Sequence, residues 1–167
     1  MRNKGFSILE LAVIMTISTI IGLAIAFNFV TVHYLRSMTQ DNIALSRETR
    51  IAMNHMTRVL RFAKPATIDD TVANQISATI EGVPQHLDFI TSDTNIAYTR
   101  DTDNNTLEYT QGAEAAVVIA GGGERDIDIT YFQPSWDSTE VELEIKLTAQ
   151  KESRSVSLLT KIRPLGE

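Results

Sequence analysis

A single carboxylate, Glu10, stands in the otherwise uncharged and strongly apolar stretch of residues 6–32. Placing a charged side chain inside a bilayer costs roughly 2.5–3.5 kcal/mol even on insertion scales, so an ionisable residue there indicates a function. A buried carboxylate is tolerated when it is paired with a cation. The chemistry that this placement indicates is therefore an ion pair in apolar surroundings, and the cation has to be identified.

Two aspartates and an asparagine, Asp101, Asp103 and Asn105, imitate the opening of a calcium-binding loop. The rest of that pattern is missing, because Thr106 stands where a glycine is required and Gly112 where a bidentate glutamate is required. Aspartate and asparagine are also good turn formers. We therefore expect a structural hairpin here, with a calcium site as the weaker alternative, and no other metal or cofactor.

Four arginines, Arg47, Arg50, Arg58 and Arg61, cluster in a stretch that contains neither glycine nor proline. Clustered cations on a helix are typical of a face that contacts DNA or a protein partner, and also of a plain solvated face. The net charge of −6 argues against nucleic-acid binding by the chain as a whole. Acidic neighbours in the same assembly are the partners that this charge balance favours.

No catalytic constellation is predicted. The three histidines, His33, His55 and His86, share no metal-ligand spacing. We expect His33 to mark a membrane boundary and the other two to be surface or edge residues. The chain has no nucleophile elbow and no phosphate-binding loop, so no enzymatic activity is expected.

The apolar stretch 6–32 would form a helix longer than the roughly 30 Å of a bilayer's hydrocarbon core. One interpretation is a secretory signal, with Arg2 and Lys4 as its basic start and cleavage after Ala26, which would release a soluble secreted domain. Against it, the apolar run continues beyond that position. A plain membrane anchor explains the length of the stretch but not Glu10.

The run Gly5-Phe6-Ser7-Ile8-Leu9-Glu10-Leu11 resembles the class III signal of type IV pilins and type II secretion pseudopilins. The resemblance implies that a prepilin peptidase cuts between Gly5 and Phe6, and that Phe6 is then N-methylated. It also implies that Glu10 is the glutamate this family keeps near the mature start for assembly. The implied partners are other pilin or pseudopilin subunits, the peptidase, an inner-membrane assembly platform, and membrane lipid before assembly.

Such a cleavage would supply a cation for Glu10. The new α-amino group at Phe6 would titrate near pH 8, so it would be largely protonated, and methylation would keep its charge. In a bundle of apolar helices this amine is the natural counter-ion for Glu10 of a neighbouring subunit, and the pair would fix the axial register. In the membrane, Glu10 could instead extend toward the lipid headgroups.

Residues 50–63 indicate which kind of pilin or pseudopilin the chain resembles. Their sequence, Arg-Ile-Ala-Met-Asn-His-Met-Thr-Arg-Val-Leu-Arg-Phe-Ala, resembles the stretch after the membrane helix in PilW-like minor pilins and J-type minor pseudopilins. This second resemblance implies a minor subunit that initiates filament assembly at the tip. A DNA-binding competence pilin is an alternative within the same family. The implied location is the inner membrane, single-pass, with the head outside the cytoplasm, and then the filament.

We predict an α+β fold in which a long N-terminal helix packs against an antiparallel β-sheet domain. The segments are a leader (1–5), a transmembrane and assembly helix (6–32), an amphipathic helix (33–64) and a β-rich head (65–167). Apolar residues at three- and four-residue steps predict the face of the second helix that meets the sheet. This stripe comprises Leu45, Thr49, Ala52, Met53, Met56, Val59, Leu60 and Ala63.

Alternation of apolar and polar residues predicts strands after Pro65. They span residues 76–80, 87–89, 96–98, 107–109, 127–131, 141–147 and 156–162, with turns at 103–105, 121–123 and 133–135. The 167-residue chain has no cysteine, which excludes disulfides and thiolate metal sites. The head must therefore be stabilised by packing alone.

Overall fold

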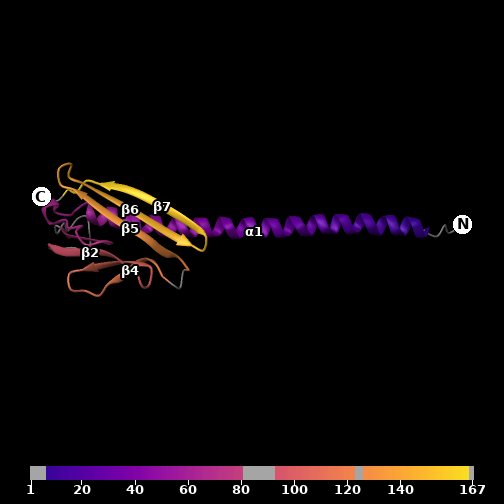
Figure 1. Cartoon of the computed structure of the whole chain (residues 1–167), viewed down its shortest axis with the longest axis horizontal. Helices are drawn as coiled ribbons and strands as arrows, with labels where there is room; N and C mark the ends of the chain where they lie inside the picture. Colours follow the sequence, from indigo (N-terminus) through magenta and orange to yellow (C-terminus); the bar gives the residue numbers. More distant parts are fainter. Residues whose placement is uncertain (1–6, 81–92, 123–125, 166–167) are drawn as a thin grey trace. The chain divides into compact units, whose positions relative to one another are not determined.

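The computed structural model describes residues 7–80, 93–122 and 126–165. A long helix, α1 (Ile8–Leu60), is followed by a short 3-10 helix, η1 (Pro65–Thr67), and by strands (Figure 1). The class is α+β, as predicted. The strands are β1 (Gln75–Ile80), β2 (Thr94–Asp101), β3 (Thr106–Gln111), β4 (Val117–Gly121), β5 (Asp128–Asp137), β6 (Glu142–Lys151) and β7 (Arg154–Ile162).

The strands form two antiparallel sheets in which neighbours in sequence are neighbours in space. The first sheet has the order β1-β2-β3-β4, and the second has the order β5-β6-β7. Figure 1 shows the second sheet, in orange to yellow, as a ribbon layer distinct from β2 and β4. Tight hairpins join β2 to β3 and β6 to β7, with Asp101 opposite Thr106 and Lys151 opposite Arg154. In these two hairpins, strands adjacent in sequence pair directly through a short connection.

The chain divides into two compact units, residues 1–41 and 42–167, and α1 contributes to both. In the second unit, which we call the head, the C-terminal part of α1 supplies one face of the hydrophobic core. Residues on this face join a single buried cluster with both sheets. All eight residues of the predicted stripe are buried, so that expectation is confirmed. Helix and sheets each hide their apolar face by packing on one another.

Strand β5 is held at both ends by bonds to other parts of the head. The Arg100 guanidinium donates from Nε to the Ile129 carbonyl at 2.6 Å, and the Ile129 N–H donates to the Asn105 carbonyl at 2.8 Å. At the other end, the Trp136 N–H donates to the Asp70 carboxylate at 2.8 Å. These bonds tie the second sheet to the β2–β3 hairpin and to the loop after η1.

Two expected turns are corrected by the structure. Pro134 lies within β5, opposite Ile145, rather than in a turn at 133–135. A proline is tolerated there because β5 is an edge strand and needs ladder bonds on one side only. Of the turn expected at 121–123, Gly121 ends β4 with a φ of +80°, Gly122 forms an isolated bridge with Ile127, and Gly123 lies outside the described residues. A Cβ at Gly121 would stand 2.6 Å from the Asn105 carbonyl oxygen, so the close approach requires glycine.

Strand β4 itself was not predicted. Its sequence, Val117-Val118-Ile119-Ala120-Gly121, does not alternate, and only its last two residues are buried. The pairing with β3 also shifts register between Leu107 and Glu108, which marks a bulge. The other predicted strands are confirmed within the described residues, and the strand expected at 87–89 lies outside them.

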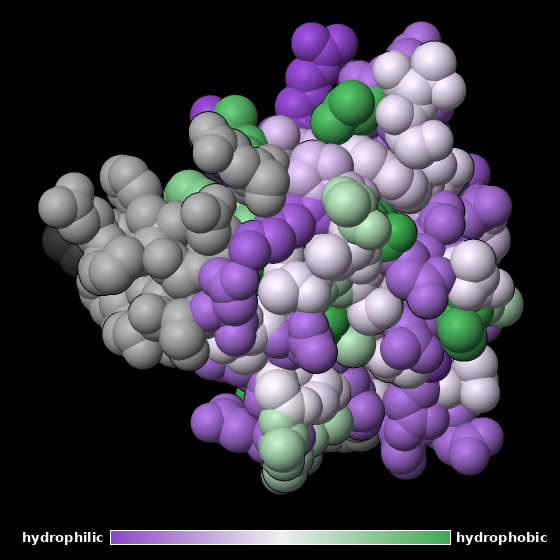
Figure 2. Space-filling model, turned by 90° about the vertical axis from the view of Figure 1, so that its left-hand side faces the viewer, coloured by the Kyte–Doolittle hydropathy of each residue, from purple (hydrophilic) through white to green (hydrophobic). Residues whose placement is uncertain are grey.

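The exposed surface of the head is predominantly polar on the face that Figure 2 presents. Hydrophilic residues, in purple, and residues of intermediate hydropathy, in white, together cover most of the described atoms in this view, and apolar residues form small, separate groups. Such scattered apolar residues are normal for a protein surface. On this face, a binding partner would have to be held largely by polar and charged contacts.

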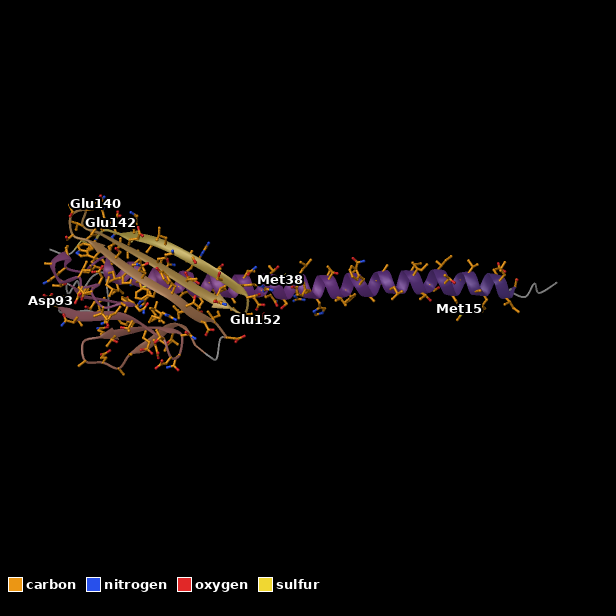
Figure 3. All side chains as sticks on the ribbon, in the orientation of Figure 1. Met15, Met38, Asp93, Glu140, Glu142 and Glu152 are labelled. Carbon is orange, nitrogen blue, oxygen red and sulfur yellow. The ribbon has the colours of Figure 1, made fainter. Side chains whose placement is uncertain are left out.

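The first unit has the opposite character. Its large apolar side chains between Ile8 and Leu35 are 49–89% exposed, and Met15 projects outward from the ribbon in Figure 3. In the part of the chain that the structure describes, α1 is the one helix long and apolar enough to cross a membrane. That criterion rests on length and composition, and a cleaved signal sequence also meets it.

Four polar side chains in this part of α1 bond to the helix's own backbone. The hydroxyls of Thr16, Thr19 and Thr31 and the amide of Asn28 each donate to the carbonyl four residues earlier, at 2.8–2.9 Å. These bonds satisfy the polar groups without an outside partner, which is the condition for a helix in lipid. Glu10 is then the one charged side chain among residues 8–32.

The shared core gives a first prediction. Met56 is fully buried, whereas Ile51 on the same helix is 48% exposed. Met56→Ala should lower the free energy of unfolding of the head by about 2–5 kcal/mol, because it removes apolar contacts and leaves a cavity. Urea unfolding of the full chain in mild detergent, followed by the fluorescence of its single tryptophan, Trp136, measures this change. Ile51→Ala is the matched control and should change the stability by less than about 0.5 kcal/mol. Equal effects of the two substitutions would contradict the assignment of the core.

Candidate functional site

The first turn of α1 contains Glu10, the one carboxylate of the apolar stretch. Gly5 and Phe6 lie outside the described residues. Ser7 caps the helix, because its hydroxyl oxygen accepts the Leu9 N–H at 3.3 Å. Glu10 follows in the first turn and is exposed. A carboxylate there is favoured by the partial positive charge of the free backbone amides, typically by 0.3–1 kcal/mol.

The pattern Ser7-x-x-Glu10 is also that of a capping box, in which the glutamate would bond back to the N–H of the serine. The Ser7 hydroxyl accepts from the N–H of Leu9, whereas the box requires the N–H of Glu10, so Ser7 is a simple N-cap. Among the described residues, none makes a hydrogen bond or salt bridge with the Glu10 carboxylate. The helix start therefore leaves the carboxylate available to a group from outside the described chain.

The four arginines share one exposed face of α1 in the head. Their spacing of three, eight and three residues places Arg47, Arg50, Arg58 and Arg61 within about 80° of the helix circumference, because each residue turns the helix by about 100°. All four are exposed. No carboxylate of the described residues forms a salt bridge with any of them. The sequence predicted the cluster, and the structure places Arg47, Arg50 and Arg58 on α1 and Arg61 one residue beyond its end.

The calcium candidate residues are engaged in a hairpin turn. The Asp101 carboxylate accepts the backbone N–H groups of Asp103 (2.8 Å) and Asn104 (3.2 Å) and the side-chain amide of Asn104 (2.6 Å). These bonds, led by the Asn104 side chain, hold the pKa of Asp101 below its ordinary value. Asn105 has a φ of 53°, and its Oδ1 accepts from Arg100 at 3.3 Å.

The oxygens of Asp101 and Asn105 thus serve the β2–β3 turn, which is the hairpin expected from the sequence. Over the ranges that the structure describes, no group of three or more histidine, cysteine, aspartate or glutamate side chains could hold a metal ion.

His55 is a residue whose surroundings the sequence did not predict. It is half-buried, not at a free surface, and its Nδ1 lies 3.0 Å from the hydroxyl of Tyr98. The rings of Tyr98 and Tyr109 stand edge-on to the imidazole, with centroids 5.9 and 5.1 Å away. Position in sequence gives no sign of this contact, because it depends on the register of β2 against β3. His86 lies outside the described residues.

The surroundings of His55 keep the cluster uncharged near neutral pH. Burial lowers the pKa of His55, and the nearby Arg58 guanidinium lowers it further. Burial also raises the pKa of Tyr98 well above its ordinary value and that of Tyr109 to about 12. The cluster joins α1 to the first sheet through one hydrogen bond and two ring contacts of His55.

A second prediction follows from the lowered pKa of His55. In the unfolded chain His55 takes up a proton near pH 6.5, whereas in the folded head it does so only at lower pH. The stabilising difference is fully present above pH 6.5 and is lost as the pH falls through the folded pKa. The urea concentration at the unfolding midpoint should therefore decrease when the pH is lowered from 7.5 to 5.5. His55→Gln should make this midpoint less dependent on pH. An NMR titration that placed the pKa of His55 at or above 6.5 would contradict this account.

Comparison of the chain with protein-family models, curated proteins and solved structures finds no match. No family is assigned by similarity, and the function has to rest on residues and geometry. The feature with the most chemical content is Glu10, a carboxylate without a described partner, in the first turn of an apolar helix that also builds the core of the head.

Proposed function

We propose that the chain is a minor pilin or pseudopilin, stored in a membrane through α1 and then built into a type IV pilus or a type II secretion pseudopilus. The observation that carries the proposal is Glu10, without a described partner, in the first turn of an apolar helix. The resemblance of residues 5–11 to the pilin class III signal supports it.

Processing supplies the partner of Glu10. A prepilin peptidase cuts between Gly5 and Phe6, and the freed amine of Phe6 is methylated and stays positively charged. In the filament this cation pairs with Glu10 of a neighbouring subunit among apolar helices. Pairing offsets the cost of burying each charge alone and selects one axial register, because a shifted neighbour would leave both charges unpaired.

The continuity of α1 supports a role in assembly. One helix, Ile8–Leu60, carries exposed apolar side chains in its first unit and buried core residues in the head. An assembly platform that extracts the apolar part from lipid thereby acts directly on the element around which the head is folded. Helix packing with other subunits then replaces the lipid around the apolar side chains.

The subclass rests on residues 50–63, which resemble PilW-like minor pilins and J-type minor pseudopilins. A minor subunit of this kind joins other minor subunits and initiates the filament at its tip. The subunit is stored in the inner membrane with its head outside the cytoplasm.

Mass spectrometry of the mature protein tests the processing step. The mature chain should begin at Phe6 and carry one additional methyl group on its α-amine. Gly5→Leu should leave the leader attached, because leucine is too large for a cleavage site that requires glycine. A mature chain that began at Phe27 would identify a secretory signal cleaved after Ala26 and overturn the proposal.

Glu10→Ala tests the ion pair. The peptidase should still cleave this variant, but its incorporation into filaments should fall by about a hundredfold or more, because breaking a buried pair costs about 3–5 kcal/mol. Immunoblots of sheared filaments and of membranes measure the amount of subunit in filaments relative to the amount left in membranes. Thr16→Ala removes a polar side chain that bonds only to its own helix, and it should assemble normally. Unaltered assembly of Glu10→Ala would refute the role assigned to this carboxylate.

A further inference from the structure

The end of α1 forms one wall of a groove in the head. The Leu165 N–H donates to the Arg61 carbonyl at 2.7 Å, which holds the segment after β7 against the last turn of the helix. Two hollows of about 570 and 400 Å³ share Thr57, Arg61 and Leu165 as lining residues. We call the two hollows together the arginine groove. Arg58 and Phe62 also line the larger hollow, and Arg163 also lines the smaller one.

The groove carries uncompensated positive charge. Lys161 in its wall is neutralised, because its ammonium lies 2.6 Å from Glu142 and 3.6 Å from Glu144, and the hydrogen bond to Glu142 raises the pKa of Lys161. The three guanidinium groups, by contrast, form no salt bridge with the described residues. Figure 3 shows Glu142 at the end of the head that contains the turn between β5 and β6.

The helix terminus does not account for these cations. The carboxyl end of a helix carries about half a negative charge, which one cation offsets. Arg58 lies in the last turn of α1, where it can have this role. Arg61 lies just beyond the helix and Arg163 beyond β7, so two guanidiniums remain as excess charge.

We propose that the arginine groove binds an acidic segment of a partner polypeptide. Its carboxylates pair with Arg58, Arg61 and Arg163, and an adjacent apolar side chain packs on Phe62 and Leu165. Guanidinium groups suit this role because they bind carboxylates in a bidentate manner and keep their charge at all physiological pH values. This inference does not depend on the proposed filament, since it rests on the head alone.

The groove fits a polypeptide better than it fits DNA. A duplex is bound by lysines and arginines that neutralise a series of phosphates, for example about six to ten of them along one binding site. The groove offers three guanidiniums, and Leu165, which is 59% exposed, adds an apolar surface that a phosphate backbone cannot use. The net charge of −6 also opposes the approach of nucleic acid.

Fluorescence anisotropy with the full chain in mild detergent tests the proposal. The probe is a fluorescein-labelled peptide, Glu-Glu-Phe-Glu-Glu, and a short labelled DNA duplex is measured in parallel. Reversing Arg58 and Arg61 together to glutamate should weaken peptide binding by about tenfold or more. Arg163→Glu, at an exposed position outside α1, should weaken it as well and guards against a folding defect in the double variant.

The matched control reverses Arg47 and Arg50 to glutamate. These residues lie on the same helix face and carry the same charge, but they do not line the groove. Their reversal should change peptide affinity less than twofold. Equal losses in the two double variants would mean unspecific attraction to a basic helix and would overturn the proposal. Absence of peptide binding, or tighter binding of the duplex than of the peptide, would overturn it too.

Discussion

The head depends on the burial of one helical face against two sheets. Leu45, Ala52, Met56 and Leu60 are fully buried, and residues of both sheets belong to the same hydrophobic cluster. Two small antiparallel sheets need such a cover, since each must hide an apolar face and the chain has no cysteine to link them. The helix therefore acts as the common partner of the sheets, and β5 is fixed between them by backbone and side-chain bonds.

Much of this arrangement was predictable because the controlling interactions are periodic. The three- and four-residue steps of the stripe specified which side of α1 is buried, and two-residue alternation specified most strands. The turn at Asp101 was predictable from local side-chain chemistry. The failures occur where long-range contacts dominate: Pro134 is accommodated by an edge position, and β4 is defined by its partner strand rather than by its own pattern.

In the candidate site, too, some features follow from local sequence patterns and others from long-range contacts. The location of Glu10 in an apolar run is visible in the sequence, whereas its lack of a partner among the described residues is a property of the structure. The arginines on α1 were visible as a cluster, but Arg163 joins Arg61 only because the chain returns through β7 to the end of the helix. His55 meets Tyr98 for a similar reason. Contacts between residues so distant in sequence require the strand order, which no local pattern contains.

The backbone-directed bonds of Thr16, Thr19, Asn28 and Thr31 have a consequence for the energetics of α1. Since each of these four side chains keeps its backbone acceptor in any apolar medium, none of the four has to exchange bonds when lipid is replaced by protein. For these four groups, transfer of the helix between two such media is nearly neutral with respect to hydrogen bonding. A thermodynamic bias between the media can then arise from close packing and from the electrostatics of Glu10, the one charged side chain among residues 8–32.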